Sequence, residues 1–289
     1  MKPINPNNLS LVPIFLTMYF DETRQKLATG TGFIYKCKNK FYLITNWHNV
    51  TGLNPLTKAN LATHGGIPDV ITLTLMINDK PLQWENFTIN LYDNNKADWY
   101  VHPIHKEKID VIAIEIEMPE NFNGMIKPIN EISYNDDFEL EIADDIFVLG
   151  YPLSITGGGF FPIWKRGSVA TEPDIDYEGL PKFLIDTATK KGMSGSPVIF
   201  RRNGLHNKIE NRISLDTVIG VIQDFVGIYS GRIASNINAN TTKCNCPKCD
   251  CIDCKVVNYD FDSQLGIVWK KEVIEEIIKG NVKDEKTFA

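Results

Sequence analysis

A serine between small residues is the feature of this sequence with the clearest chemical potential. Ser194 lies in the stretch Gly192-Met193-Ser194-Gly195, and the apolar run 198–200 that follows is typical of a buried strand. Glycines on both sides let the backbone turn sharply and bring successive N–H groups to one point, which is the geometry that stabilises an oxyanion beside a nucleophile. Ser194 is therefore a candidate nucleophile, and the chain must then also supply a base and an orienting acid.

A histidine and an aspartate lie at the ends of two predicted strands in the first half of the chain. His48 follows the apolar run 41–45, and a side chain just past a strand end is well placed at the edge of a cleft. Asp110 lies near the start of the run 109–116, where it would share a face with the isoleucines that follow. A carboxylate at the end of an apolar stripe needs a hydrogen-bond donor, and a histidine N–H would supply one.

Each of these residues also has an ordinary structural interpretation. Gly-x-Ser-Gly occurs in turns that do no chemistry, and Ser196 is a rival nucleophile. His48 could be a satisfied histidine at a strand end, and Asp110 could be a surface acid that caps its strand. Asp98 is the rival acid.

The composition predicts a large globular chain. With 289 residues and 43% hydrophobic content, the chain can bury an extensive core. A net charge of −6 at pH 7 gives no electrostatic reason to expect nucleic acid or an anionic membrane as a partner. No stretch approaches the roughly 18 apolar residues of a membrane span, and residues 1–9 lack a signal-peptide core. We therefore expect a cytoplasmic protein.

Short apolar runs separated by polar or glycine-containing turns predict an all-β fold, with antiparallel sheets or barrels rather than alternating strands and helices. The predicted strands are 11–20, 30–35, 41–45, 70–76, 84–91 and 109–116 before a polar connector at 118–139, and 146–152, 163–170, 183–186, 198–200, 217–222, 225–231 and 264–269 after it. The one predicted helix, 270–280, places its apolar residues on one face, and Gly280 is the residue expected to end it.

Five of the six cysteines crowd into residues 244–254, and only Cys37 lies elsewhere. A disulfide framework would distribute its cysteines along the chain, so we expect none. Two C-x-x-C pairs in the cluster suit a structural zinc ion. The predicted ligands are Cys246, Cys249, Cys251 and Cys254. Because a single residue separates the pairs, a surface insertion with free or redox-active thiols and a metal shared between two chains stay open as alternatives.

Three blocks of the sequence resemble the signature blocks of the trypsin-like, chymotrypsin-fold serine peptidases. They are residues 43–48 with His48, residues 109–114 with Asp110 and residues 192–198 with Ser194, in the order that this family has. More narrowly, the chain is similar over about residues 9–280 to the intracellular bacterial members described as trypsin-like peptidase-domain proteins.

The resemblance implies two antiparallel six-stranded β-barrels of the chymotrypsin type, with the active site between them and a helix at the end of the chain. Residues 1–125 would form the barrel that carries His48 and Asp110. Residues 126–289 would form the barrel that carries Ser194, with a cysteine-rich insertion at 233–258 and the C-terminal helix at 270–280.

The resemblance also implies roles for the three residues. His48 would take the proton from Ser194 and later deliver it to the leaving amine, while Asp110 would hold the imidazole tautomer. The backbone N–H groups of Gly192 and Ser194 would form the oxyanion hole.

The same resemblance places the substrate along the strand 225–231, with Ser230 near the buried acid, although 218–221 is an alternative register. The predicted substrate-binding residues are Ala188, Tyr229, Ser230 and Gly231. No charge is evident near Ala188, where the base of the specificity pocket would fall, so we expect a small or apolar P1 side chain.

Two departures from the secreted members of the family bear on activation and on the cellular compartment. Met193 stands where those members carry an aspartate that receives the freed N-terminus after zymogen cleavage, so we do not expect activation by that route. No cysteine follows His48, so the disulfide that secreted members have there is absent, as a reducing compartment requires.

The leading hypothesis is a cytoplasmic serine endopeptidase that hydrolyses polypeptides through an acyl-enzyme on Ser194. It would need no cofactor, and a regulatory protein partner is one way to restrain it. The alternative is a catalytically silent scaffold that binds peptides in the cleft and contacts a partner or metal through the cysteine-rich insertion.

Overall fold

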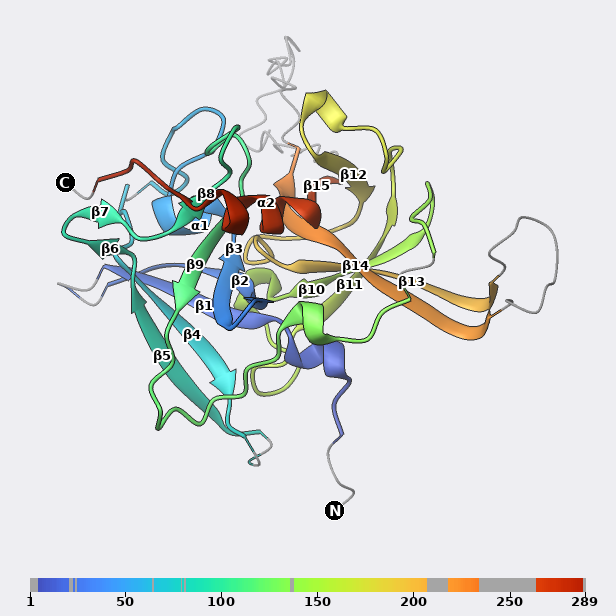
Figure 1. Cartoon of the computed structure of the whole chain (residues 1–289), viewed down its shortest axis with the longest axis horizontal. Coiled ribbons are helices and arrows are strands. Elements are labelled where there is room, and N and C mark those ends of the chain that lie inside the picture. The colour runs from blue at the N-terminus through green and yellow to red at the C-terminus, as the bar shows by residue number, and fades with distance from the viewer. Residues whose placement is uncertain are drawn as a thin grey trace, which may run out of the picture.

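The computed structural model describes residues 5–20, 23, 25–63, 65–78, 80, 82–135, 138–206, 218–233 and 264–287. Two β-rich halves lie side by side, and a short helix near the end of the chain, α2, lies over their junction (Figure 1). The predicted zinc ligands Cys246, Cys249, Cys251 and Cys254 lie outside the described residues, as does most of the insertion predicted at 233–258.

The first half is built on an eight-stranded sheet in the order β16-β8-β9-β3-β2-β1-β4-β5. Its strands are β1 (Ile14–Phe20), β2 (Gln25–Cys37), β3 (Lys40–Thr45), β4 (Val70–Met76), β5 (Trp84–Asn90), β8 (Tyr100–Val101), β9 (Ile112–Ile116) and β16 (Val282–Lys283). A separate pair consists of β6 (Tyr92–Asp93) and β7 (Lys96–Ala97), and the short helix α1 (Trp47–Thr51) follows β3.

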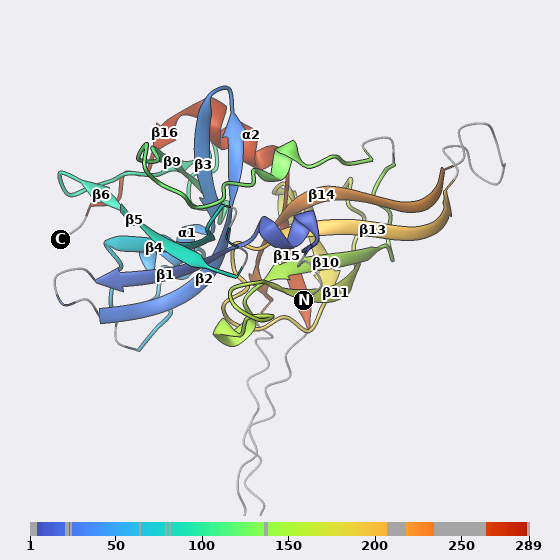
Figure 2. The ribbon, with the colours of Figure 1, turned by 90° about the horizontal axis from the view of Figure 1, so that it is seen from below.

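The second half is a closed six-stranded antiparallel barrel in the order β10-β11-β12-β15-β14-β13. Its strands are β10 (Asp145–Gly150), β11 (Ile163–Val169), β12 (Lys182–Asp186), β13 (Pro197–His206), β14 (Val218–Arg232) and β15 (Leu265–Lys270). Strands β13 and β14 continue beyond the barrel as a two-stranded arm, which Figure 2 shows projecting from the body of the molecule. Short 3-10 turns link elements in both halves: Asn8–Leu11, Ile129–Glu131, Pro152–Ser154 and Tyr177–Gly179.

The predicted all-β class with a C-terminal helix is confirmed. The six-strand count holds for the second half, whereas the sheet of the first half has eight strands in the described residues. The two extra strands, β8 and β16, have two residues each and so leave no periodic pattern in the sequence. The helix α2 (Glu272–Gly280) includes Gly280, and Asn281 rather than Gly280 adopts the left-handed conformation that ends it.

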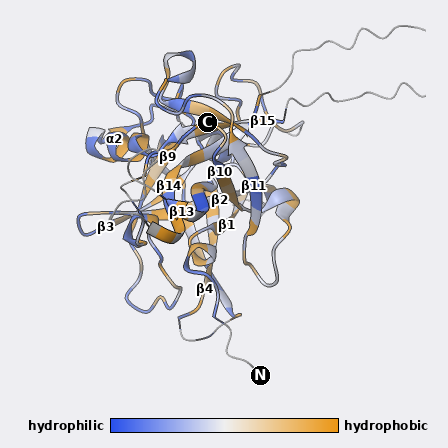
Figure 3. Ribbon diagram, turned by 90° about the vertical axis from the view of Figure 1, so that its right-hand side faces the viewer, coloured by the Kyte–Doolittle hydropathy of each residue, from blue (hydrophilic) through white to orange (hydrophobic). Residues whose placement is uncertain are grey.

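Three central strands of the first half are buried on both faces, which explains their continuous apolar runs. On β3, Leu43 faces the core of the first half, while Ile44 faces a second core shared between the halves. The shared core also contains Phe225 of β14, Trp269 of β15 and Ile274 of α2. Hydrophobic residues accordingly lie on the strands at the centre of the molecule (Figure 3). Burial of this shared apolar surface holds the halves together.

The segment after α2 returns to the first half and supports the start of α1. Val282 of β16 pairs with Val101 of β8. Asp284 Oδ2 accepts hydrogen bonds from the indole nitrogens of Trp47 at 2.7 Å and Trp99 at 2.9 Å. Both indoles are buried, and Trp47 directly precedes His48.

We predict that Asp284→Ala destabilises the protein by about 2–5 kcal/mol, because it leaves two buried indole N–H groups without an acceptor. Asp284→Asn retains one oxygen and should cost less than half as much. Urea unfolding of the three proteins measures both differences. Equal stability of the alanine variant and the wild type would contradict this role for Asp284.

Candidate active site

The candidate base and acid lie at adjacent ends of two paired strands. Thr45 at the end of β3 pairs with Ile112 at the start of β9, which brings the residues just beyond them together. His48 Nδ1 lies 2.6 Å from Asp110 Oδ2, and the backbone N–H of His48 donates to Asp110 Oδ1 at 3.0 Å. The two contacts together fix the imidazole relative to the carboxylate.

The Asp110 carboxylate is buried, with 1% of its surface exposed, and it receives donors from both halves. The donor from the second half is the Ser230 hydroxyl, on β14, at 2.5 Å from Asp110 Oδ2, and the donor from the first half is His48. The backbone carbonyl of Asp110 accepts separately from the Asn46 side chain at 2.6 Å. With a carboxylate facing Nδ1, the proton of a neutral His48 belongs on Nδ1. Its Nε2 is then the atom that can accept a proton.

The turn that carries Ser194 is bonded to the first half. The Thr31 N–H of β2 donates to the Ser194 carbonyl at 2.9 Å, and the Asn49 side chain donates to the same oxygen at 3.2 Å. Asn49 follows His48 in α1, so the serine backbone is held beside the segment that carries the candidate base. On the other side, the Gly195 N–H donates to the Tyr229 carbonyl at 2.9 Å.

Two glycines in this turn have backbone conformations and surroundings that exclude a side chain. Gly192 has φ +94°, and a Cβ there would lie 2.4 Å from the Tyr151 carbonyl oxygen. Gly195 has φ +84°, and a Cβ there would lie 2.1 Å from the Thr31 carbonyl oxygen. The predicted sharp turn therefore depends on both glycines.

The amides of this turn fall into two groups. Those of Met193, Gly195 and Ser196 donate to backbone carbonyls. Those of Gly192 and Ser194 donate to no acceptor within the described part of the chain. Unpaired N–H groups at these two positions are what an oxyanion hole requires.

The Ser194 hydroxyl makes no hydrogen bond to the His48 imidazole in the described residues. Ser194 is partly exposed, and the His48 side chain is 15% exposed. Hydrogen bonds between nucleophile and base are often long without substrate and shorten when it binds.

The rival residues lie in different surroundings. Ser196 is fully buried against Gly150 of β10, where a Cβ would lie only 2.0 Å from the Ser196 hydroxyl oxygen. Asp98 forms a half-exposed ion pair with Lys283 instead of contacting an imidazole. Ser196 is therefore not placed to act as the nucleophile, and Asp98 is not placed to orient a histidine.

The predicted substrate-binding residues lie next to this turn. Ser230 sits at an irregularity in the pairing of β14 with β15, between Tyr229 and Gly231. A Cβ on Gly231 would meet no atom of the described residues within 4 Å. The alternative register, 218–221, lies at the far end of β14, where Val218 pairs with His206.

Tyr229 fills the space beneath this strand. Its ring is 2% exposed and lies against Gly266, where a Cβ would be 2.7 Å from the ring. Its hydroxyl is hydrogen-bonded to that of buried Thr189, and burial raises the pKa of Tyr229 to about 12. Ala188, the predicted base of the specificity pocket, is exposed beside Thr189.

Sequence reasoning missed three residues that hold the turn: Thr31, Asn49 and Leu153. The Leu153 N–H donates to the Lys191 carbonyl at 2.7 Å from a left-handed conformation with φ 52°. None of the three carries a chemical signal in the sequence. Thr31 lies between two glycines, in Gly30-Thr31-Gly32, which is the one local hint of a close backbone approach.

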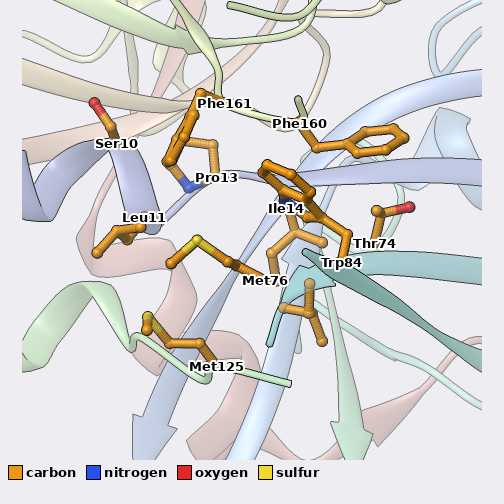
Figure 4. A pocket seen from close by; sticks show the side chains of 11 residues that line it. Ser10, Leu11, Pro13, Ile14, Thr74, Met76, Trp84, Met125, Phe160 and Phe161 are labelled. Carbon is orange, nitrogen blue, oxygen red and sulfur yellow. The ribbon is translucent and has the colours of Figure 1, made fainter. Parts of the chain in front are cut away.

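Two concave features lie apart from these residues. A cavity of about 20 Å³, room for about one water molecule, lies between β1, Trp84 of β5 and the loop with Phe160 and Phe161 (Figure 4). A polar groove of about 560 Å³ runs along α2, next to Tyr134. The candidate residues line neither feature.

The described residues contain no group of three or more side chains of histidine, cysteine, aspartate or glutamate arranged to hold a metal ion. The predicted zinc site lies outside them and stays a prediction. Neither helix in the described part combines the length and the hydropathy of a membrane span. The cytoplasmic location also stays a prediction.

Comparison with known proteins gives one family match. The model for the trypsin-like peptidase domain matches residues 30–205, more than half of the chain. No curated protein matches the sequence.

Two solved structures give weak likenesses. An HtrA-type protease with a tripeptide has a TM-score of 0.48 and 12% identity, covering 96% of this chain and 62% of its own. The Rv3671c protease in its inactive form has a TM-score of 0.42 and 17% identity, covering 94% and 89%. The chain thus spans less than two thirds of the length of the first structure.

The surroundings of Ser196 lead to a prediction that separates the two serines. The buried Ser196 hydroxyl has no hydrogen-bond partner in the described residues, so Ser196→Ala should raise the free energy of unfolding by about 1 kcal/mol. It should leave labelling by a fluorophosphonate unchanged. Denaturant unfolding and probe labelling test both statements, and loss of labelling would identify Ser196 as the reactive serine.

Proposed function

Because the chain belongs to the family of trypsin-like peptidase domains, we propose that it is a serine endopeptidase whose triad is Ser194, His48 and Asp110. The substrate is a polypeptide. No step of the proposed reaction uses a cofactor.

One observation carries this proposal: the bond of 2.6 Å between His48 and a carboxylate that is almost fully buried, next to the turn of Ser194. A buried charge is costly unless it is paired, so a fold keeps one where its interaction is needed. The N–H groups of Gly192 and Ser194, which have no acceptor among the described residues, support the same chemistry.

The proposed reaction follows from these positions. His48 Nε2 takes the proton of the Ser194 hydroxyl as its oxygen attacks the peptide carbonyl carbon. The N–H groups of Gly192 and Ser194 stabilise the oxyanion, the C–N bond breaks, and His48 returns the proton to the leaving amine. Water then hydrolyses the ester on Ser194, again with His48 as base.

Strand β14 supplies the surface on which an extended substrate would lie. Ser230 anchors this strand to Asp110, and a Cβ on Gly231 would contact nothing in the part of the chain that the structure describes. The pairing of β14 with β13 ends at Ile228. A peptide paired with β14 beyond that point would bring its scissile bond to Ser194, because Tyr229 is bonded through its backbone to Gly195 and Ser196.

We predict that a fluorophosphonate labels the wild type stoichiometrically at Ser194, with loss of fluoride, and does not label Ser194→Ala. His48→Ala should be labelled at least about a thousandfold more slowly, because the hydroxyl loses its base. Mass spectrometry of the labelled peptide identifies the site. Unchanged labelling of Ser194→Ala contradicts the proposal, and peptide binding without labelling of the wild type favours the scaffold.

Tyr229 leads to a prediction about specificity. Its ring occupies space between Thr189 and Gly266, so a small P1 side chain should be preferred. Tyr229→Val should raise kcat/KM for a peptide with leucine or phenylalanine at P1 by about tenfold relative to one with alanine. Phe183→Val, which opens space elsewhere in the same core, is the control. An unchanged P1 profile of Tyr229→Val would show that the ring does not limit the pocket.

A further inference from the structure

We propose that Thr31 is a positioning residue that fixes the oxyanion loop through its side-chain hydroxyl. This inference rests on the proposed function. Thr31 lies on β2 in the first half of the protein, whereas the loop it holds belongs to the second half. The hydroxyl donates to the Gly192 carbonyl at 2.9 Å.

Gly192 is a flexible position of this loop, since it has no Cβ and has φ +94°. Both peptide groups that flank it are held from outside the loop. The Lys191 carbonyl accepts from the Leu153 N–H at 2.7 Å, and the Gly192 carbonyl accepts from the Thr31 hydroxyl. In a trans peptide the N–H points opposite to the C=O, so holding the Lys191 carbonyl directs the Gly192 N–H away from Leu153.

Thr31 is itself held rigidly. It is fully buried, its N–H donates to the Ser194 carbonyl at 2.9 Å, and its carbonyl accepts from the Thr45 hydroxyl at 2.8 Å. Thr31 therefore donates to two carbonyls of the turn, to that of Ser194 through its backbone N–H and to that of Gly192 through its hydroxyl. Gly150 leaves room for this arrangement, because a Cβ there would lie 2.8 Å from the Thr31 hydroxyl oxygen.

Leu153, which holds the Lys191 carbonyl, is anchored independently of Thr31. The turn Pro152–Ser154, which contains Leu153, is tied to β2 by the Ser154 hydroxyl, 2.8 Å from that of Thr29. The segment that follows this turn packs on the first half, where the ring centroids of Phe160 and Trp84 lie 5.7 Å apart. Loss of the Thr31 hydroxyl thus removes one restraint on the peptides that flank Gly192 and leaves the bond from Leu153 to the Lys191 carbonyl in place.

A valine at position 31 keeps the shape and the backbone bonds of threonine but removes the hydroxyl donor. Among the described residues, the Gly192–Met193 peptide is then held only by the Met193 N–H, which donates to the Lys190 carbonyl at 3.3 Å. Movement of this peptide displaces Gly192, so the Gly192 N–H spends less time aimed at the oxyanion. Because this N–H stabilises charge that exists only in the transition state, the maximal rate falls while substrate affinity is retained. A serine at position 31 keeps the donor.

The test measures acylation by p-nitrophenyl acetate in the full-length protein, as the burst rate at saturating ester and the ester concentration at half saturation. Thr31→Val should lower the burst rate by about tenfold, less than the 10²–10³ lost with a direct oxyanion donor. The ester concentration at half saturation should change by less than about twofold. Thr31→Ser should stay within about threefold of the wild type.

Controls separate positioning from folding. Thr171→Val removes a hydroxyl that accepts from the Leu184 N–H at 2.9 Å in the second half, away from the turn, and should leave the burst rate unchanged at a similar melting temperature. A peptide aldehyde, whose adduct oxygen occupies the oxyanion site, should bind Thr31→Val about tenfold more weakly than the wild type. An uncharged peptide amide of the same sequence should bind both equally.

The outcomes distinguish the two proposals. A wild type with neither burst nor fluorophosphonate labelling overturns the proposed function. An active wild type with an equally active Thr31→Val overturns the role of Thr31 alone. Equal losses in Thr31→Val and Thr31→Ser also overturn it, since the hydroxyl would then not be the group that matters.

Discussion

The burial of the Asp110 carboxylate is the constraint on which the rest of the site depends. A charge with 1% exposure needs donors in fixed positions, and this one takes them from α1, through His48, and from β14, through Ser230. The irregular pairing at Ser230 frees that residue from the regular ladder and turns its hydroxyl toward the acid, which is a common use of a bulge near a functional site. This carboxylate is thus one point at which hydrogen bonds fix the two halves relative to each other.

The apolar core beneath this site and the hydrogen bonds above it stabilise the structure in different ways. The shared core, with Ile44, Phe225 and Ile274 among its members, brings the halves together without specifying direction. The bonds from Thr31 and Asn49 to the Ser194 turn are directional, and they select one orientation of the turn among those that the core permits. Close packing at Gly195, with Thr31 on one side, leaves the turn little room to adopt another orientation.

The parts of this structure that could be predicted from the sequence are those with local patterns. Apolar runs marked the strands and α2, and the surroundings of His48, Asp110 and Ser194 marked the candidate triad. The two-residue strands β8 and β16 left no pattern, and the supporting role of Asp284 depends on a tail that crosses back to the first half. Thr31 and Leu153 act through one hydroxyl and one backbone N–H, groups that most residues of the chain also carry. Their importance follows only from tertiary placement.

The contacts that hold the Ser194 turn are neutral. Met193, where secreted relatives carry an aspartate, is fully buried among apolar side chains of the second barrel, including Val198 and Phe183. The remaining restraints are hydroxyl, amide and carbonyl groups, as at Thr31, and none of these changes charge near neutral pH. Because the restraints come from both halves, displacing the turn requires breaking bonds on two sides of it. The proposed activity is therefore more readily inhibited by blocking substrate access along β14 than by rearranging the turn.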